Sequence, residues 1–121
     1  MASKVVGMSD DCLFCKFVSG EIAPDVVHET DTTLAFRDIA PQAPTHVLVV
    51  PKKHHANIVD LSAQAPETLV ALFDAVRAVA ESEGVADRFR LVLNTGAEAG
   101  QSVFHVHAHV LGGRQMEWPP G

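Results

Sequence analysis

The sequence predicts an α+β fold: a mostly antiparallel, five-stranded sheet with one main helix and a short N-terminal helix. Two observations predict it: five runs of apolar and β-branched residues, and a single long stretch of helical periodicity between the third and fourth runs. The 121 residues suit one domain, and 47% hydrophobic against 20% charged residues excludes a disordered chain. Residues 1–10 are expected to form a flexible leader, and residues 11–121 one domain with a C-terminal tail at 112–121.

The first half of the chain predicts a short helix and three strands. Asp10 or Asp11 is a candidate cap for a helix that runs to about Val18 and ends at Gly20. Strands are expected at 26–29 and 33–37, on either side of a polar turn. The run 45–50 is almost wholly apolar and is stopped by Pro51, so it is expected to be a central strand covered on both faces.

The second half predicts the main helix and two more strands. A polar connection at 52–57 is followed by a helix over about 66–83, ended by Gly84. Its apolar stripe is expected to pack in the core and consists of Leu69, Leu72, Phe73, Val76, Val79 and Ala80. Strands are expected at 88–94 and 102–111, joined by a glycine-containing loop at 95–100.

Charge and hydropathy narrow the functional classes. The formal net charge of −6 argues against general nucleic-acid binding, because phosphate backbones require a basic footprint. No apolar run reaches the roughly 18 residues of a membrane span, and the start lacks the apolar core of a signal peptide. A soluble, cytoplasmic protein with no membrane or nucleic-acid partner is therefore expected. Seven histidines are the first indication of chemistry.

Three of those histidines alternate along the last predicted strand. Side chains two residues apart on a strand point the same way, so His105, His107 and His109 are expected to share one face towards a cleft. Phe104, Val106, Ala108 and Val110 are expected to pack on the core. The outer histidines lie roughly 13 Å apart along a strand, which is too far to clamp one metal ion together. An arrangement in which one imidazole attacks an anion held by its neighbours fits better, whereas an ordinary polar strand face remains the plain alternative.

The segment His105-Val106-His107-Ala108-His109-Val110-Leu111 resembles the signature of the histidine triad superfamily. The segments 40–46, 51–54 and 100–104 and the ending 112–121 are similar to its nucleotide-binding branch. The resemblance covers about residues 10–121 and implies a histidine triad fold.

The resemblance implies a hydrolase of purine nucleoside phosphoramidates that forms a nucleotidyl-histidine intermediate on His107 and needs no metal for catalysis. Dinucleoside polyphosphate hydrolysis and a nucleotide-binding scaffold role are the alternatives. The family's homodimer, with the tail reaching towards the partner's site, is also implied. The other implied catalytic residues are His46, Ser102, His105 and His109, and the implied substrate-binding residues are Phe14, Ile22, Phe36, Asp38, Ile39, Asn94, Gly100, Gln101, Val103 and Trp118.

Several of these residues also have an ordinary structural interpretation that involves no function. The apolar members Phe14, Ile22, Phe36 and Ile39 would ordinarily be core residues. Asp38 and Asn94 are common turn residues, and His46 would ordinarily lie at the surface. The resemblance, and not the spacing, favours function at these positions.

The only two cysteines, Cys12 and Cys15, have a spacing that is typical of metal ligands. We expect a structural zinc ion completed by His54 and His105, a pattern that the resemblance to prokaryotic relatives supports. Free packing thiols and a redox pair are the alternatives. His28 and His55 have no expected role and are predicted to lie at the surface.

Overall fold

The computed structural model describes residues 11–121, so the expected leader at 1–10 lies outside the described residues. The elements follow one another as α1 (Leu13–Ser19), β1 (Val26–Glu29), β2 (Thr33–Arg37), β3 (Thr45–Pro51), α2 (Ile58–Gln64), α3 (Pro66–Ser82), β4 (Phe89–Val92), the 3-10 helix η1 (Ala97–Ala99) and β5 (Ala108–Gly112). This order confirms the predicted α+β fold, with α3 as its main helix. No helix within residues 11–121 has the length and apolar character that crossing a membrane requires.

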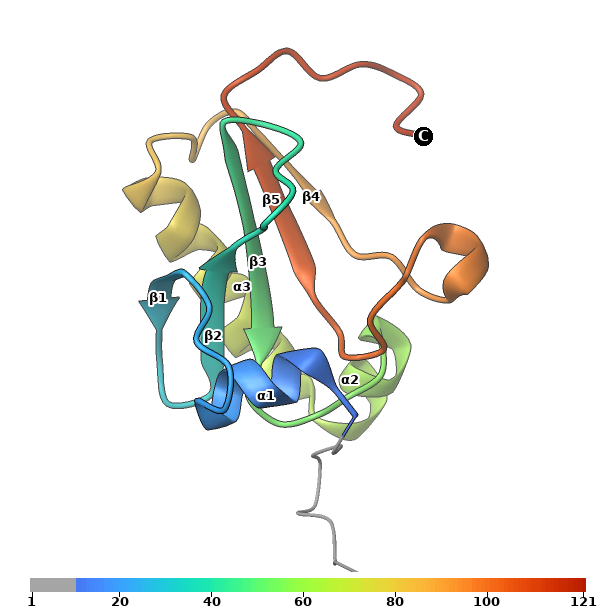
Figure 1. Cartoon of the computed structure of the whole chain (residues 1–121). Helices are drawn as coiled ribbons and strands as arrows, with labels where there is room; N and C mark the ends of the chain where they lie inside the picture. The colour runs from blue at the N-terminus through green and yellow to red at the C-terminus, as the bar shows by residue number, and fades with distance from the viewer. Residues whose placement is uncertain (1–10) are drawn as a thin grey trace, which may run out of the picture.

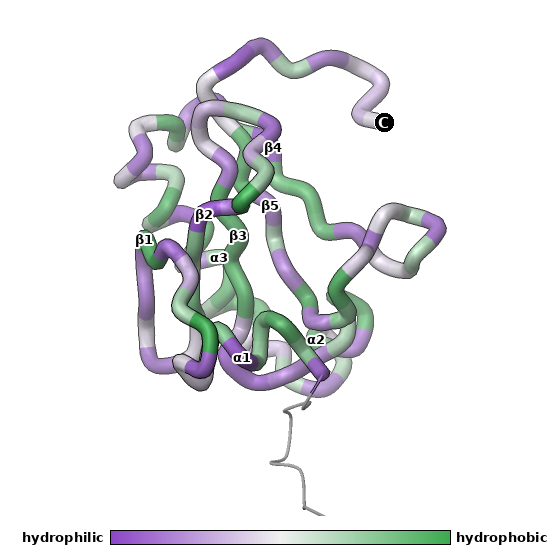
Figure 2. Tube along the Cα trace, in the orientation of Figure 1, coloured by the Kyte–Doolittle hydropathy of each residue, from purple (hydrophilic) through white to green (hydrophobic). Residues whose placement is uncertain are grey.

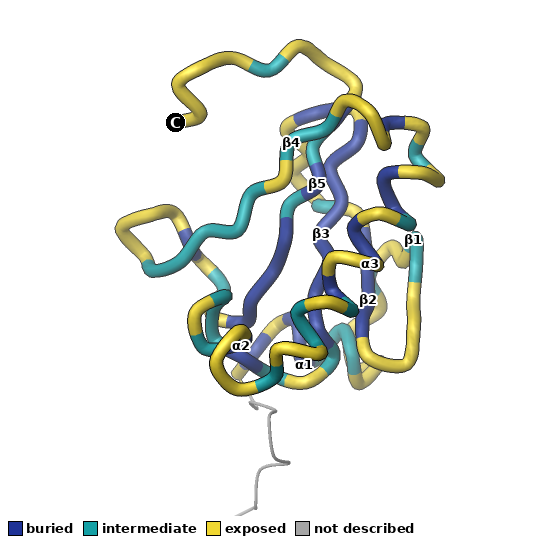
Figure 3. The backbone as a smooth tube through the Cα atoms, turned by 180° about the vertical axis from the view of Figure 1, so that it is seen from behind, coloured by how far each residue is buried: buried dark blue, intermediate teal, exposed yellow. Residues whose placement is uncertain are grey.

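The five strands form one antiparallel sheet in the order β1-β2-β3-β5-β4 (Figure 1). β3 lies at the centre, and every one of its seven residues is buried. Figure 2 shows the middle of this strand as a continuous hydrophobic segment, and the same strand is dark blue in Figure 3, seen from behind. The prediction of a central strand covered on both faces is therefore confirmed.

Different helices pack against the two faces of the sheet. On one face, Val47, Val49 and Val110 pack against α3, which contributes Leu72, Ala75, Val76 and Val79 to the larger core cluster. On the other face, Phe36 and Leu48 pack against Phe14 of α1. Because α1 has only seven residues, it covers part of this second face, and the rest is available for a site (Figure 1).

Two expectations about the last strand are wrong. β5 begins at Ala108 rather than at residue 102, and residues 103–105 form a bend. The backbone N–H of Val106 bonds to the carbonyl oxygen of His55 at 2.7 Å instead of to a strand partner. Phe104 therefore leaves the core and is 51% exposed, whereas Val106, Ala108 and Val110 are buried as expected.

Smaller differences concern the helices. The helix α2 was not predicted, and α1 is capped by the Sγ of Cys12 rather than by Asp11. The other expected cap, Asp10, lies outside the described residues. Phe73, expected in the core stripe of α3, is 44% exposed. His55, expected at the surface, is buried, and His28 is half-buried.

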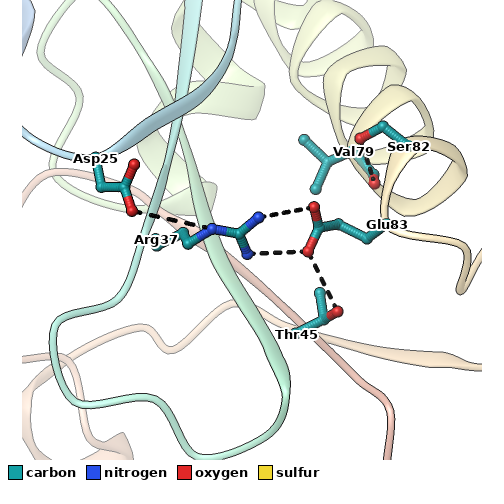
Figure 4. A network of polar contacts seen from close by, with 6 residues as sticks. All are labelled: Asp25, Arg37, Thr45, Val79, Ser82 and Glu83. Carbon is teal, nitrogen blue, oxygen red and sulfur yellow. Dashed lines mark hydrogen bonds and ion pairs between the residues drawn. The ribbon is translucent and has the colours of Figure 1, made fainter.

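An ion pair fixes the end of β2 to the end of α3 (Figure 4). The guanidinium of Arg37 donates to both carboxylate oxygens of Glu83, at 2.9 and 3.0 Å, and the hydroxyl of Thr45 donates to the same carboxylate at 3.3 Å. The Arg37 guanidinium thus binds the residue that follows α3, whereas its neighbour Phe36 packs against Phe14 of α1.

Candidate active site and metal cluster

A hollow of about 560 Å³ opens on the α1 side of the sheet. The lining residues come from α1 and the loop that follows it, from β2, β3 and residues 102–103, and from the segment 105–111, which we call the triad segment. Nine of the residues expected at the site line it, namely Phe14, Ile22, Phe36, Asp38, Ile39, Ser102, Val103, His107 and His109. The hollow also contains Phe17 and Leu48, which we did not predict. Phe17 follows Phe14 at helical spacing, which is the signal that could have placed it on the same face.

The ring of His107 is held in one tautomer. Its Nδ1 lies 2.8 Å from the backbone carbonyl oxygen of His105 and, because a carbonyl only accepts, Nδ1 carries the hydrogen. The Nε2 of neutral His107 is then an unprotonated nitrogen on a ring that lines the hollow. Burial lowers the pKa of His107, an effect that its bond to the His105 carbonyl and the charge of Asp38 oppose. The neutral, nucleophilic form is thereby favoured.

A second imidazole pair stands beside His107. His46 and His109 are diagonal neighbours on β3 and β5, with 3.0 Å between Nε2 of His46 and Nδ1 of His109. The backbone N–H of Gln42 donates to Nδ1 of His46, so neutral His46 carries its hydrogen on Nε2 and donates it to His109. His109 consequently presents an Nε2–H group on a ring that lines the hollow.

Burial favours the neutral form of both rings of this pair. Burial lowers the pKa of His109 to about 4, with further contributions from His107 and His46. Burial also lowers the pKa of His46, although the Asp38 carboxylate, 3.5 Å from its Nε2, opposes this effect. At neutral pH the hollow therefore contains an unprotonated nitrogen on His107 and a donor on His109.

Residues 94–103 form a loop beside the triad. Gly100 has φ +98°, which favours glycine, and a side chain there would approach the Asn94 carboxamide at 3.6 Å. Gln101 is 3% exposed, and its carboxamide bonds to the backbone of this loop and of the preceding linker rather than facing the hollow. Only Ser102 and Val103 of this loop line the hollow.

The four expected metal ligands come together between α1 and the triad segment. Nδ1 of His105 lies 3.3 Å from the Sγ of Cys12 and 3.4 Å from that of Cys15, whose Sγ is also 3.4 Å from Nδ1 of His54. Ligand atoms on one tetrahedral zinc ion would be separated by about 3.6 Å for a sulfur–nitrogen pair. The cluster therefore has nearly the spacing that a tetrahedral ion requires.

The tautomer of His105 also fits a metal. Its Nε2 donates to the carbonyl oxygen of Pro51 at 2.7 Å, which leaves Nδ1 unprotonated and directed at the two thiols. Burial lowers the pKa of His105 to about 4, so this nitrogen is a ready ligand. The ring is fully buried, so His105 belongs to the cluster and not to the hollow.

A second group of potential ligands, Asp38, His46 and His109, does not fit a metal as well. Coordination through Nε2 would require neutral His46 to carry its hydrogen on Nδ1. That nitrogen already accepts the N–H of Gln42, and two donors would then face each other. We therefore interpret this group as a hydrogen-bonded chain.

Trp118 and the buried His55 lie apart from the hollow. Trp118 is 82% exposed in the tail that follows β5 and is absent from the hollow's lining. The Nδ1 of His55 bonds to Gln64, and its buried Nε2 has no hydrogen-bond partner within residues 11–121. His55 thus supports the linker between β3 and α2.

Comparisons with known proteins agree with this fold and site. The model of the HIT domain family matches residues 19–116. A HIT-like protein of Synechococcus elongatus is 48% identical, covering 94% of this chain and all of that protein. A 14 kDa zinc-binding protein of Brassica juncea is 43% identical, covering 92% of this chain and all of that protein.

Among solved structures, a HIT family hydrolase from Legionella pneumophila superposes with a TM-score of 0.87 at 50% identity, covering 92% of this chain and all of that one. Alternating histidines at 105, 107 and 109, which lead into a strand of a five-stranded antiparallel sheet, define the class of histidine triad proteins. The chain belongs to the HIT domain family, and the expected family resemblance is confirmed.

Proposed function

We propose that this protein is a hydrolase of purine nucleoside phosphoramidates that works through a covalent nucleotidyl-histidine. The observation that carries the proposal is the 2.8 Å contact between Nδ1 of His107 and the carbonyl oxygen of His105, which leaves Nε2 of a hollow-lining imidazole unprotonated. An unprotonated imidazole nitrogen at neutral pH is a competent nucleophile towards phosphorus. The name of the Legionella pneumophila relative, a HIT family hydrolase, supports this class of reaction.

In the first step, Nε2 of His107 attacks the phosphorus as the bond from phosphorus to the amine nitrogen breaks. The leaving nitrogen takes one proton from water, while Nε2–H of His109, whose ring lies 4.9 Å from that of His107, donates a hydrogen bond to the reacting phosphoryl group. The nucleotidylated His107 ring carries a positive charge. In the second step, water attacks phosphorus as the bond to Nε2 of His107 breaks, and the proton released neutralises the hydroxide left by the first step, so that the mononucleotide leaves and neutral His107 is restored.

The nucleoside would occupy the apolar part of the hollow. Phe14 and Phe36 are buried with an edge-on contact of 5.3 Å between ring centroids, and the rim adds Ile22 and the 99% exposed Ile39. Asp38 lines the same hollow with its carboxylate 3.5 Å from Nε2 of His46, and a carboxylate there suits the ribose hydroxyls. Ser102 and Val103 would hold the phosphate, with Asn94 in the same loop beside Gly100.

Zinc is the metal we assign to the cluster of Cys12, Cys15, His54 and His105. Two thiols and two imidazoles are ligands that zinc prefers, and the names of plant relatives such as the 14 kDa zinc-binding protein support this choice. With all four positions filled by the protein, zinc would supply a structural cross-link between α1 and the triad segment. It would leave no open position for catalysis.

We also infer a homodimer. Phe73 on α3 and Leu91 on the edge strand β4 are 44% and 36% exposed, and they line one apolar hollow of about 200 Å³. A second copy would cover this face. The apolar β3 gives no support to the dimer because α3 and α1 already cover it. Light scattering tests the inference, and a monomer mass would contradict it.

The test of function is rapid-quench mass spectrometry with an adenosine phosphoramidate. We expect an adduct of one nucleotidyl group on His107, formed and lost at rates that account for turnover. His107→Gly should abolish the adduct and reduce turnover by about 10⁴-fold or more, while AMP binding stays measurable. His28→Gly, outside the hollow, is the control. Turnover without an adduct, or faster turnover of a diadenosine polyphosphate, would overturn the proposal.

A further inference from the structure

The side chain of Gln101 is buried where most glutamines would be exposed. Its exposed fraction is 3%, and all three hydrogen bonds of its side chain are to backbone groups. Oε1 accepts the N–H of Gly96 at 2.9 Å. Nε2 donates to the carbonyl oxygens of Ala56 at 2.6 Å and Val103 at 3.1 Å. The carboxamide thus joins three separate points of the chain.

These bonds close the loop that leads into Ser102. The backbone N–H of Gln101 also donates to the carbonyl oxygen of Gly96 at 3.0 Å, so residue 101 binds both polar groups of Gly96. On the far side, the bond to Val103 reaches across Ser102. The bond to Ala56 fastens the loop to the linker after β3, next to the bond from Val106 to His55.

Only a carboxamide satisfies all three backbone groups. The N–H of Gly96 requires an acceptor, and the two carbonyl oxygens require two hydrogens from one nitrogen. A glutamate would place a carboxylate oxygen against two carbonyl oxygens, and a methionine would leave all three groups without this partner. The orientation of the carboxamide is fixed for the same reason.

We propose that Gln101 is a positioning residue that holds Ser102 and Val103 in the geometry that receives the substrate's phosphate. This inference rests on the proposed function because it assigns these two hollow-lining residues to the phosphate. Gln101 would then act through Ser102 and Val103 and would not contact the substrate itself. Its removal should weaken binding of the phosphate and leave binding of the nucleoside, which the other wall of the hollow provides.

The test compares affinities for adenosine and AMP in the wild-type protein and in Gln101→Met. We expect the dissociation constant for AMP to rise about tenfold and that for adenosine to change by less than about twofold, as for a lost phosphate contact. The rate of adduct formation should fall about tenfold or more at temperatures well below the melting point. Gln115→Met, which removes an exposed carboxamide in the tail after β5, is the matched control. A purely structural role would lower the melting temperature without changing the AMP-to-adenosine ratio, and that result would overturn the proposal.

A measurement on the wild-type protein covers the case in which Gln101→Met does not fold. The amide hydrogen of Gly96 should exchange slowly with deuterated water, since Gln101 binds it, although Gly96 lies in a loop. Exchange as fast as that of a solvent-exposed loop amide would overturn the proposal. Absence of hydrolysis in a wild-type protein that still binds AMP would instead contradict the proposed function alone.

Discussion

His46 and His109 share one hydrogen bond of 3.0 Å, in which the backbone N–H of Gln42 determines which ring donates. This bond directs the remaining hydrogen of His109 towards the hollow. His46→Phe removes the donor and frees His109 to place its hydrogen on the wrong nitrogen. We expect turnover of an adenosine phosphoramidate to fall about 10²-fold, with AMP affinity changed much less.

A control and a rescue variant make this prediction specific. His28→Phe replaces a half-buried histidine on β1 outside the hollow and should keep wild-type turnover. His46→Gln retains an N–H donor in place of the ring and should recover part of the loss. Equal activities of His46→Phe and the wild-type protein would show that the chain from His46 to His109 plays no part in the reaction.

Asp38 is expected to recognise the ribose. Its Oδ1 accepts the N–H of Ala40 at 2.8 Å, which fixes the carboxylate at the edge of the hollow. Asp38→Ala should raise the Michaelis constant for a ribonucleoside phosphoramidate about tenfold, with little effect on a 2′,3′-dideoxy substrate. The measurement is the ratio of kcat/KM for the two substrates. A ratio equal to that of the wild-type protein would remove Asp38 from the ribose site.

Metal removal should destabilise the protein. Two thiols and two imidazoles meet at α1, the linker after β3 and the triad segment, so an ion there would join three parts of the chain. A chelator should lower the melting temperature by about 10 °C, and added zinc should restore it. Cys15→Ser should melt at the lower temperature with or without chelator. Elemental analysis that finds no zinc in protein purified without chelator would contradict the assignment.

The sequence was sufficient to predict most of the sheet, because its signals there are local. The alternating and apolar runs at 26–29, 33–37 and 45–50 gave β1, β2 and β3 nearly to the residue. It did not reveal α2, a seven-residue helix whose only buried residue is Leu61 and whose cap, Asn57, looks like any turn residue. A short helix with one buried residue has too little periodicity to be recognised.

The sequence predicted which residues form the site, but not how they are divided between the hollow and the metal cluster. Alternation along 105–109 predicted three histidines on one strand face, whereas the bend at 103–105 gives His105 to the metal cluster and leaves His107 and His109 at the hollow. The bend depends on the bond between Val106 and His55, fifty-one residues away in sequence. Such long-range pairing of backbone groups leaves no pattern in a single sequence.

Glu83 should contribute stability that depends on pH. Its hydrogen bond from Arg37 lowers the pKa of Glu83 below its ordinary value, and the Glu83 side chain, just after the end of α3, is only 16% exposed. A carboxyl whose pKa is lower in the folded state stabilises the protein above its unfolded-state pKa of about 4.3, and this contribution is lost as the pH falls through the folded-state value.

Glu83→Gln should therefore lower the free energy of unfolding by about 1 kcal/mol at pH 7, a figure that allows for the 42% exposed Arg37 side chain. Urea denaturation at pH 7 and pH 3 measures the difference, which should be smaller at pH 3 than at pH 7. Glu81→Gln, two residues earlier on an exposed part of α3, is the control and should match the wild-type protein at both pH values. A difference between Glu83→Gln and wild type that is as large at pH 3 as at pH 7 would show that the carboxamide disturbs packing, and that the charge of Glu83 is not what stabilises the end of α3.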